Sequence, residues 1–250
     1  MDCILAPEFG TRNGYDRFML ILAIDTALDA CAMAVLDTEA GSLRAHEAQA
    51  MARGHAEALM PMVDRVMQAA GLSFSALDRI AVTVGPGSFT GLRVGISAAR
   101  GLGLAAEKQV VGVTTLSAFA APHLGESGAP ILSAIDARHD HVYMQVVGGD
   151  GTALVRPRVV AMTDVFEAAS FGELHLVGNA ARVVADRWPA DAVQPAGVDQ
   201  QTAPDIAWVA WLGAAADPAA SRPRPLYLRP VDAKPQVVAA ADQGELSAAP

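Results

Sequence analysis

The chain has 250 residues, 52% of them hydrophobic, and carries a formal net charge of −9 at pH 7. This length suits one large domain or two small ones with a substantial core, and the acidic charge argues against a free-standing nucleic-acid binder. The two cysteines fit neither a metal-ligand spacing nor a disulfide framework, so we expect a cytoplasmic protein. No apolar run reaches the roughly 18 residues that cross a bilayer, so we expect no membrane partner.

The first half of the chain predicts an α/β arrangement in which three strands come before the first helix. Hydrophobic periodicity and turn residues predict strands at 20–27, 31–37, 43–49, 79–84 and 109–113, and helices at 55–70 and 90–106. The short link at 27–30 favours a hairpin, Gly71 favours the end of the first helix, and Ser75 with Asp78 resembles a capping box. This order is typical of one half of an actin-like, ribonuclease-H-like fold.

The second half repeats the strand pattern after a break near residue 126. Strands are predicted at 130–136, 142–148, 153–160 and 175–179, followed by helices at 180–188 and 205–216. We therefore expect an N-terminal lobe over 19–124, a smaller second lobe over 125–204, and a C-terminal segment over 205–230 that packs back on the first lobe. Residues 1–18 are expected to form an N-terminal extension and residues 231–250 a tail, both disordered.

A glycine-rich turn, GPGSFTG, joins a predicted strand to a predicted helix. Free amide groups at the start of a helix attract anions, although no lysine follows the glycines as it would in a Walker A loop. A tight, well-packed turn is the alternative interpretation of the same residues. Together with the polar end of the first strand, the candidates for nucleotide or anion contact are Asp25, Thr26, Gly85, Gly87, Ser88 and Thr90.

Small residues recur every four positions along the predicted helix at 90–106, at Gly91, Gly95, Ala99 and Gly103. Glycine inside a helix costs about 1 kcal/mol relative to alanine, so the stripe predicts a close approach by another element. We expect a second helix along this ridge, either the helix at 55–70 of the same chain or one from a second subunit. Replacing Gly95 by leucine is then expected to abolish subunit pairing and leave the fold intact.

Five segments resemble the TsaB (YeaZ) family, the non-catalytic relatives of the tRNA threonylcarbamoyltransferase. They are ILAIDTA (21–27), RGHAEALMPMV (53–63), VTVGPGSFTGLRVG (82–95), AIDARHDHVY (134–143) and PLYLRP (225–230). The resemblance implies an actin-like ATPase fold of two similar lobes with mixed sheets flanked by helices. It also implies a scaffold role in attaching a threonylcarbamoyl group to the adenosine beside the tRNA anticodon.

The resemblance further implies the partners and the cofactors. The chain would pair with the catalytic paralogue TsaD, be joined by the small ATPase TsaE, form a homodimer when alone, and touch tRNA only indirectly. It would hold no cofactor of its own, with ATP or ADP and Mg at the interface with its partners, and none of its residues would be catalytic. The interface would comprise His55, Leu59, Met62, Val63, Val66, Gly91, Arg93, Val94, Gly95, Ala98, Ala99 and Leu102.

Other activities on the same residues are weaker alternatives. Asp25 at the end of the first strand is compatible with an independent ATP-binding enzyme such as a small-molecule kinase, but no second phosphate loop is recognisable. A metallopeptidase of the kind suggested by the older glycoprotease label is not supported, because His55 and Glu57 do not form an HExxH motif. His139 and His141 supply too few ligands for a catalytic metal, so no metal site is expected.

Overall fold

The fold is built on two five-stranded sheets in a computed structural model that describes residues 18–125 and 128–229. The first sheet contains β1 (Leu20–Asp25), β2 (Ala30–Asp37), β3 (Ser42–Ala50), β4 (Arg79–Gly85) and β5 (Gln109–Thr114). The second contains β6 (Ile131–Asp136), β7 (His141–Val147), β8 (Ala153–Ala161), β9 (His175–Val177) and β10 (Gly197–Asp199). The tail expected at 231–250, and the extension expected at 1–18 apart from Phe18, lie outside the described residues.

The two sheets have the same topology. The first has the strand order β3-β2-β1-β4-β5, and the second, read in the matching direction, has β8-β7-β6-β9-β10. In each sheet the first three strands in sequence pair antiparallel, and the two later strands are added in parallel. This repetition confirms the predicted fold class, an α/β protein of two similar lobes with mixed sheets.

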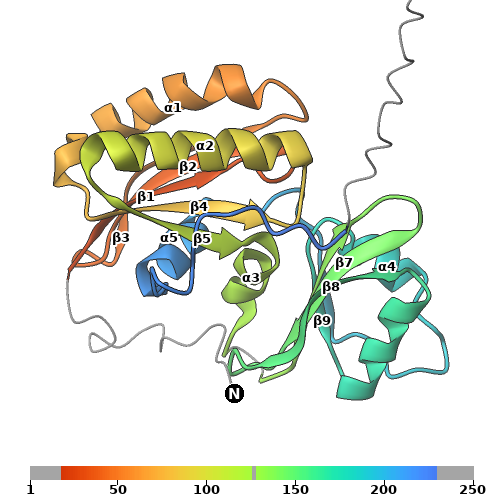
Figure 1. Cartoon of the computed structure of the whole chain (residues 1–250). Coiled ribbons are helices and arrows are strands. Elements are labelled where there is room, and N and C mark those ends of the chain that lie inside the picture. Colours follow the sequence, from red (N-terminus) through yellow and green to blue (C-terminus); the bar gives the residue numbers. More distant parts are fainter. Residues whose placement is uncertain (1–17, 126–127, 230–250) are drawn as a thin grey trace, which may run out of the picture.

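Helices cover both faces of the first sheet (Figure 1). Helices α1 (His55–Ala70) and α2 (Phe89–Ala106) lie on one face, and α5 (Ile206–Ala215) lies on the other. The strands β1, β2 and β4 are buried along almost their whole length, as expected for strands covered on both faces. The edge strand β3 alternates between partly buried and exposed positions over most of its length, because only one of its faces is covered.

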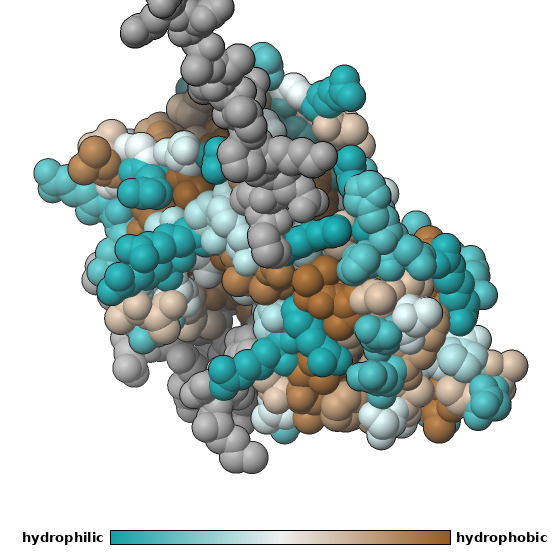
Figure 2. Space-filling view, turned by 45° about the vertical axis from the view of Figure 1, so that its right-hand side comes forward, coloured by the Kyte–Doolittle hydropathy of each residue, from teal (hydrophilic) through white to brown (hydrophobic). Residues whose placement is uncertain are grey.

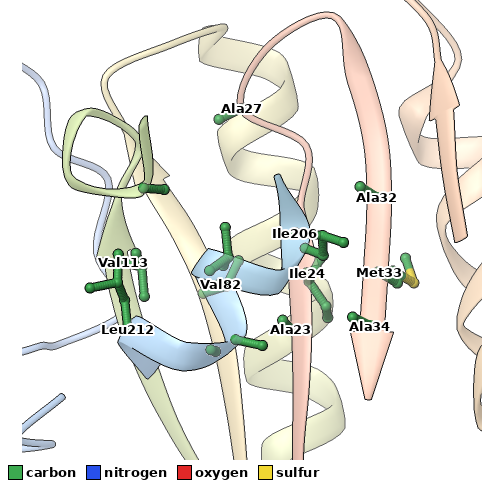
Figure 3. Close-up of a cluster of buried hydrophobic side chains, with 14 of the residues drawn as sticks. Ala23, Ile24, Ala27, Ala32, Met33, Ala34, Val82, Val113, Ile206 and Leu212 are labelled. Atoms are coloured by element: carbon green, nitrogen blue, oxygen red, sulfur yellow. The ribbon is translucent and has the colours of Figure 1, made fainter. Parts of the chain in front are cut away.

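Helix α5 carries the C-terminal part of the chain back onto the first lobe, as the sequence predicted. Its sequence, IAWVAWLGAA, is apolar all round, which is typical of a helix buried in a core. Figure 3 shows Ile206 of this helix beside Ile24 of β1 and Leu212 beside Val113 of β5. Arg79 Nη1 binds the end of the helix by donating to the carbonyl oxygens of Gly213, Ala214 and Ala216, at 2.9, 3.0 and 2.9 Å.

Shorter elements connect the two lobes and complete the second one. Helix α3 (Thr115–Ala120) contacts both sheets and continues into the 3-10 helix η2 (Ala121–His123). The second lobe also contains η3 (Asp164–Phe171) and α4 (Ala181–Asp186). Figure 2 shows hydrophilic and hydrophobic residues interspersed on the side of the molecule that carries this lobe.

One local prediction, the capping box, was wrong. The 3-10 helix η1 (Phe74–Ala76) begins after Ser73 without a side-chain cap, so Ser75 and Asp78 do not form a capping box. Asp78 Oδ2 instead accepts a hydrogen bond from the backbone nitrogen of Leu20 at 2.9 Å, because the start of β1 has an unpaired amide group nearby. None of the helices in the described ranges is long and apolar enough to cross a membrane.

Candidate functional site

The candidate site lies where β1 and β4 end against the start of α2. Asp25 is the last residue of β1, Gly85 is the last residue of β4, and Ser88 precedes α2. Gly85 has a φ of 105°, a conformation that favours glycine. Ser88 caps the start of α2, because its Oγ accepts a hydrogen bond from the nitrogen of Gly91 at 3.3 Å.

Asp25 is a fully buried carboxyl group with one satisfied and one unsatisfied oxygen. Its Oδ1 accepts from Thr83 Oγ1 at 2.5 Å and from the nitrogen of Ala27 at 3.0 Å. Its Oδ2 has no hydrogen-bond partner among the described residues. Burial raises the pKa of Asp25 above its ordinary value, and the hydrogen bonds from Thr83 and Ala27 oppose that shift only in part. Burial therefore makes ionisation of Asp25 less favourable than that of an exposed aspartate.

The loop after β1 closes the space in front of the glycine-rich turn. Thr26 Oγ1 donates to the carbonyl oxygen of Gly91 at 2.7 Å, and the nitrogen of Ser88 donates to the carbonyl oxygen of Ala27 at 2.7 Å. A Cβ on Gly87 would lie only 2.2 Å from that same oxygen of Ala27. The turn and the loop are therefore in direct contact, and Thr26 between them is 1% exposed.

The structure thus brings the six predicted contact residues together, but only three of them, in the turn and at the start of α2, reach the surface. Ser88 and Thr90 are exposed and Gly87 is half-buried, whereas Asp25, Thr26 and Gly85 are buried. A nucleotide or anion could touch Asp25 only if the loop after β1 moved. The sequence analysis missed Thr83, whose signal was a lone hydroxyl in an otherwise apolar strand; the parallel pairing of Ile24 with Val82 places it beside Asp25.

The glycine stripe of α2 packs against the first sheet and the loop after β1, which corrects the expectation of a second helix along this ridge. A Cβ on Gly91 would lie 2.1 Å from the carbonyl oxygen of Thr26, and one on Gly95 would lie 2.3 Å from Thr26 Oγ1. A Cβ on Gly103 would lie 2.3 Å from Val110 Cγ2 of β5. Replacing Gly95 by leucine would therefore damage the fold itself, contrary to our expectation.

The residues predicted for the subunit interface divide into two groups. One group is buried in the interior of this chain and consists of His55, Leu59, Met62, Val63, Val66, Gly91, Gly95 and Ala99. The other group reaches the surface of α2 and consists of Arg93, Val94, Ala98 and Leu102. The outer surface of α1 and α2 also includes Met60, Gly101 and Leu104, which the sequence analysis did not select. The interface itself stays a prediction.

Comparisons with known proteins agree on one family. The family model described as TsaD, tRNA N6-adenosine threonylcarbamoyltransferase, matches residues 47–187. The chain is 42% identical over 126 residues to the tRNA threonylcarbamoyladenosine biosynthesis protein TsaB of Escherichia coli (strain K12), covering 50% of this chain and 53% of that protein. The match therefore spans about half the length of this curated relative.

Two further relatives are matched over almost their whole length. An uncharacterized protein of Mycobacterium tuberculosis (strain ATCC 25618 / H37Rv) is 34% identical over 228 residues, covering 87% of this chain and 95% of that protein. Among solved structures, YeaZ from Pseudomonas aeruginosa has a TM-score of 0.68 at 28% identity, covering 84% of this chain and 100% of that one. The similarity thus extends across both lobes.

Proposed function

The chain belongs to the TsaB (YeaZ) branch of the tRNA N6-adenosine threonylcarbamoyltransferase family, and on that premise we propose that it is the scaffold subunit of threonylcarbamoyladenosine biosynthesis. In this role it pairs with the catalytic paralogue TsaD and makes that paralogue active on tRNA in the cytoplasm. The threonylcarbamoyl transfer takes place on the paralogue, and no residue of this chain takes part in the chemistry.

The closed state of the Asp25 site is the observation that carries the non-catalytic part of this proposal. A general base or a metal-binding carboxylate needs to be ionised and within reach of its substrate. Asp25 is 0% exposed, and burial raises its pKa. The nitrogen of Ser88 donates a hydrogen bond of 2.7 Å to the carbonyl oxygen of Ala27, and this bond holds the adjoining loop in place. These features favour a structural role for Asp25 over turnover of ATP or hydrolysis of a peptide.

The outer surface of α1 and α2 supports the pairing part of the proposal. Val94, Ala98 and Gly101 follow one another along α2 at spacings of four and three residues, so they lie on one side of the helix. Their small or short side chains would allow a helix of a partner to approach closely. We infer that TsaD, or a second copy of this chain when TsaD is absent, occupies this surface. TsaE would then join the assembled pair.

In this proposal, nucleotide binds only at the interface of the assembled subunits. ATP or ADP with Mg would be held between the subunits, with Ser88 and Thr90 as the contacts that this chain offers, because both are exposed at the start of α2. Binding of ADP to the chain alone, measured by calorimetry, is expected to be absent and to appear only when TsaD and TsaE are added.

Reconstitution of the reaction tests the proposed function. TsaD, TsaE, ATP, Mg²⁺, a donor of the threonylcarbamoyl group and unmodified tRNA would be combined with and without this chain, and threonylcarbamoyladenosine would be measured by mass spectrometry. We expect modified tRNA only when the chain is present, and no hydrolysis of ATP by the chain alone. Modification at the same rate without the chain would overturn the scaffold role, and ATP turnover by the isolated chain would overturn its non-catalytic character.

A further inference from the structure

Two aromatic rings and an arginine form an exposed cluster beside the start of α2. The rings of Phe89 and Tyr227 have centroids 5.6 Å apart and are tilted by 31°. The guanidinium carbon of Arg93 lies 3.7 Å from the centroid of the Phe89 ring, and Arg93 Nε donates to the hydroxyl oxygen of Tyr227 at 3.3 Å. Phe89 is 39% exposed and Tyr227 is 43% exposed, so much of both rings faces solvent.

The cluster is held in place by the fold. Phe89 and Arg93 are one turn apart on α2, whose first turn is fixed by the contacts of Gly91 with Thr26. Tyr227 lies on the segment that follows α5 and crosses the first sheet. In this segment the carbonyl oxygen of Ser221 accepts from the nitrogen of Gly112 at 2.8 Å, and the nitrogen of Leu226 donates to the carbonyl oxygen of Val84 at 2.7 Å. The rings are therefore preorganised before any ligand binds.

The charged side chains on the two segments that carry the cluster are all positive, although the chain as a whole is acidic. Helix α2 and residues 218–229 contain no aspartate or glutamate. They carry Arg93 and Arg100 on the helix and Arg222 and Arg224 on the crossing segment, all four of them exposed. The ion pairs found within residues 18–125 and 128–229 involve none of these four side chains.

Apart from Arg93, which the sequence analysis placed at the interface, this surface differs from the one proposed for subunit pairing. Successive residues of an α-helix are about 100° apart around its axis. Phe89, Arg93 and Arg100 share one side of α2, whereas Val94, Ala98 and Gly101 share a neighbouring side. A partner packed on the small residues would therefore leave room at the ring edge where Tyr227 lies.

We propose that Phe89, Tyr227 and the surrounding arginines bind unpaired nucleotides of RNA. The exposed rings would stack on bases, which all present a flat π face. The arginines would pair with the phosphate groups that follow, and arginine can also stack on bases. An acidic peptide would match the arginines but would leave the two rings without a role. The proposal goes beyond the scaffold function, in which tRNA is contacted only through the partner subunits.

Fluorescence anisotropy tests the proposal on the full chain alone. The probe is a fluorescein-labelled anticodon stem-loop RNA, compared with a blunt-ended RNA duplex of similar length. We expect the stem-loop to bind more tightly than the duplex, and Tyr227→Ala or Phe89→Ala to weaken stem-loop binding by about tenfold. Tyr227→Phe, which keeps the ring, should bind nearly as the wild type does, and this variant separates stacking from damage to the fold.

The contribution of the arginines is measured by the dependence of RNA binding on salt concentration. Arg222→Ala and Arg224→Ala should each lower the slope of log K against log salt by about 0.7 for every phosphate group of the single strand that the arginine neutralises. The matched controls are Phe171→Ala, an exposed ring on the second lobe, and Arg182→Ala, an exposed arginine of α4. Both controls should bind as the wild type does.

Specific outcomes would overturn the proposal. One is that the wild-type chain does not bind the stem-loop. The other is that the wild type, Tyr227→Ala and Phe89→Ala bind the stem-loop with the same affinity. In a separate co-purification with TsaD, loss of TsaD binding by these variants with unchanged RNA binding would assign the surface to a protein partner instead. Because the anisotropy assay contains no TsaD, its failure leaves the reconstitution test of the scaffold function unaffected, and the two proposals can fail separately.

Discussion

Thr26 and Gly91 hold the start of α2 against the end of β1. Thr26 Oγ1 donates to the carbonyl oxygen of Gly91 at 2.7 Å, and the carbonyl oxygen of Thr26 lies 2.1 Å from the position that a Cβ of residue 91 would take. The hydrogen bond needs this close approach, and the approach needs glycine. The residue pair thus explains why a helix with good packing retains glycine at this position.

Alanine substitutions at two glycines of α2 should have opposite effects on stability. Gly91→Ala would force a methyl group against backbone atoms that cannot move aside, and we expect the free energy of unfolding to fall by about 1–3 kcal/mol. Gly101→Ala, where a Cβ would meet no atom within 4 Å, should raise it by up to about 1 kcal/mol. Urea denaturation followed by circular dichroism measures both, and equal effects would contradict the assigned contact.

Asp25 should make the folded chain less stable as the pH rises from about 4. An unfolded aspartate ionises near pH 3.9, but burial raises the pKa of Asp25 in the folded chain, and hydrogen bonds oppose that shift only in part. As the pH increases, the unfolded state loses its proton first, so the stability falls until the folded pKa is passed and is constant above it.

The variant Asp25→Asn isolates this effect, because asparagine keeps the Oδ1 acceptor for Thr83 and Ala27 but does not titrate. We expect the wild type to lose stability relative to this variant as the pH rises from about 4 towards neutrality. Urea denaturation across this pH range gives the comparison. A constant difference at every pH would show that Asp25 ionises normally in the folded state.

Asp37 should show the opposite pH dependence. Burial opposes its ionisation, but hydrogen bonds from the nitrogen of Ala40, from Arg44 and from the nitrogen of Glu39 outweigh burial and lower the pKa of Asp37. Arg44 donates to Asp37 Oδ2 through both Nε and Nη2, at 2.8 and 2.7 Å. The stabilisation is therefore present above about pH 4 and is lost as the pH falls through the folded pKa.

Asp37→Asn should lower the free energy of unfolding by about 1 kcal/mol at neutral pH, because Arg44 is partly exposed and water screens the pair. The wild type should lose stability relative to Asp37→Asn as the pH falls, whereas it should lose stability relative to Asp25→Asn as the pH rises. Glu47→Gln, which breaks the exposed pair of Glu47 with Arg65, serves as the control and should have a smaller effect at neutral pH. A larger effect at Glu47 would contradict the assigned role of Asp37.

The sequence predicted the elements well because their signals are local. Helix α1 begins at His55 and ends at Ala70 as predicted, since hydrophobic periodicity and Gly71 mark it directly. The capping box predicted from Ser75 and Asp78 was wrong because its signal is only local. An aspartate in a capping box and an aspartate that binds a distant strand look identical in sequence. Only the position of Leu20, 58 residues away, decides between them.

The contacts of the candidate site were harder to predict because they join distant segments. The stripe that begins at Gly91 and Gly95 indicated a close approach but not its partner, since a helix and a sheet both favour small residues. The partner, Thr26, is 65 residues from Gly91. Similarly, the hydrogen bond between Arg93 and Tyr227 spans 134 residues, and no local pattern marks it.

The variant Gly101→Glu should break subunit pairing without harming the fold. Gly101 is exposed on α2, and a Cβ there would meet no atom within 4 Å, so the isolated chain can accommodate a glutamate. A long charged side chain would prevent another helix from approaching Val94 and Ala98, and we expect at least about tenfold weaker association with TsaD, equivalent to about 1.4 kcal/mol. Analytical ultracentrifugation and co-purification measure the association. Gly101→Ala and Leu154→Glu, an exposed position of β8, should pair normally, and full pairing by Gly101→Glu would place the interface elsewhere on the molecule.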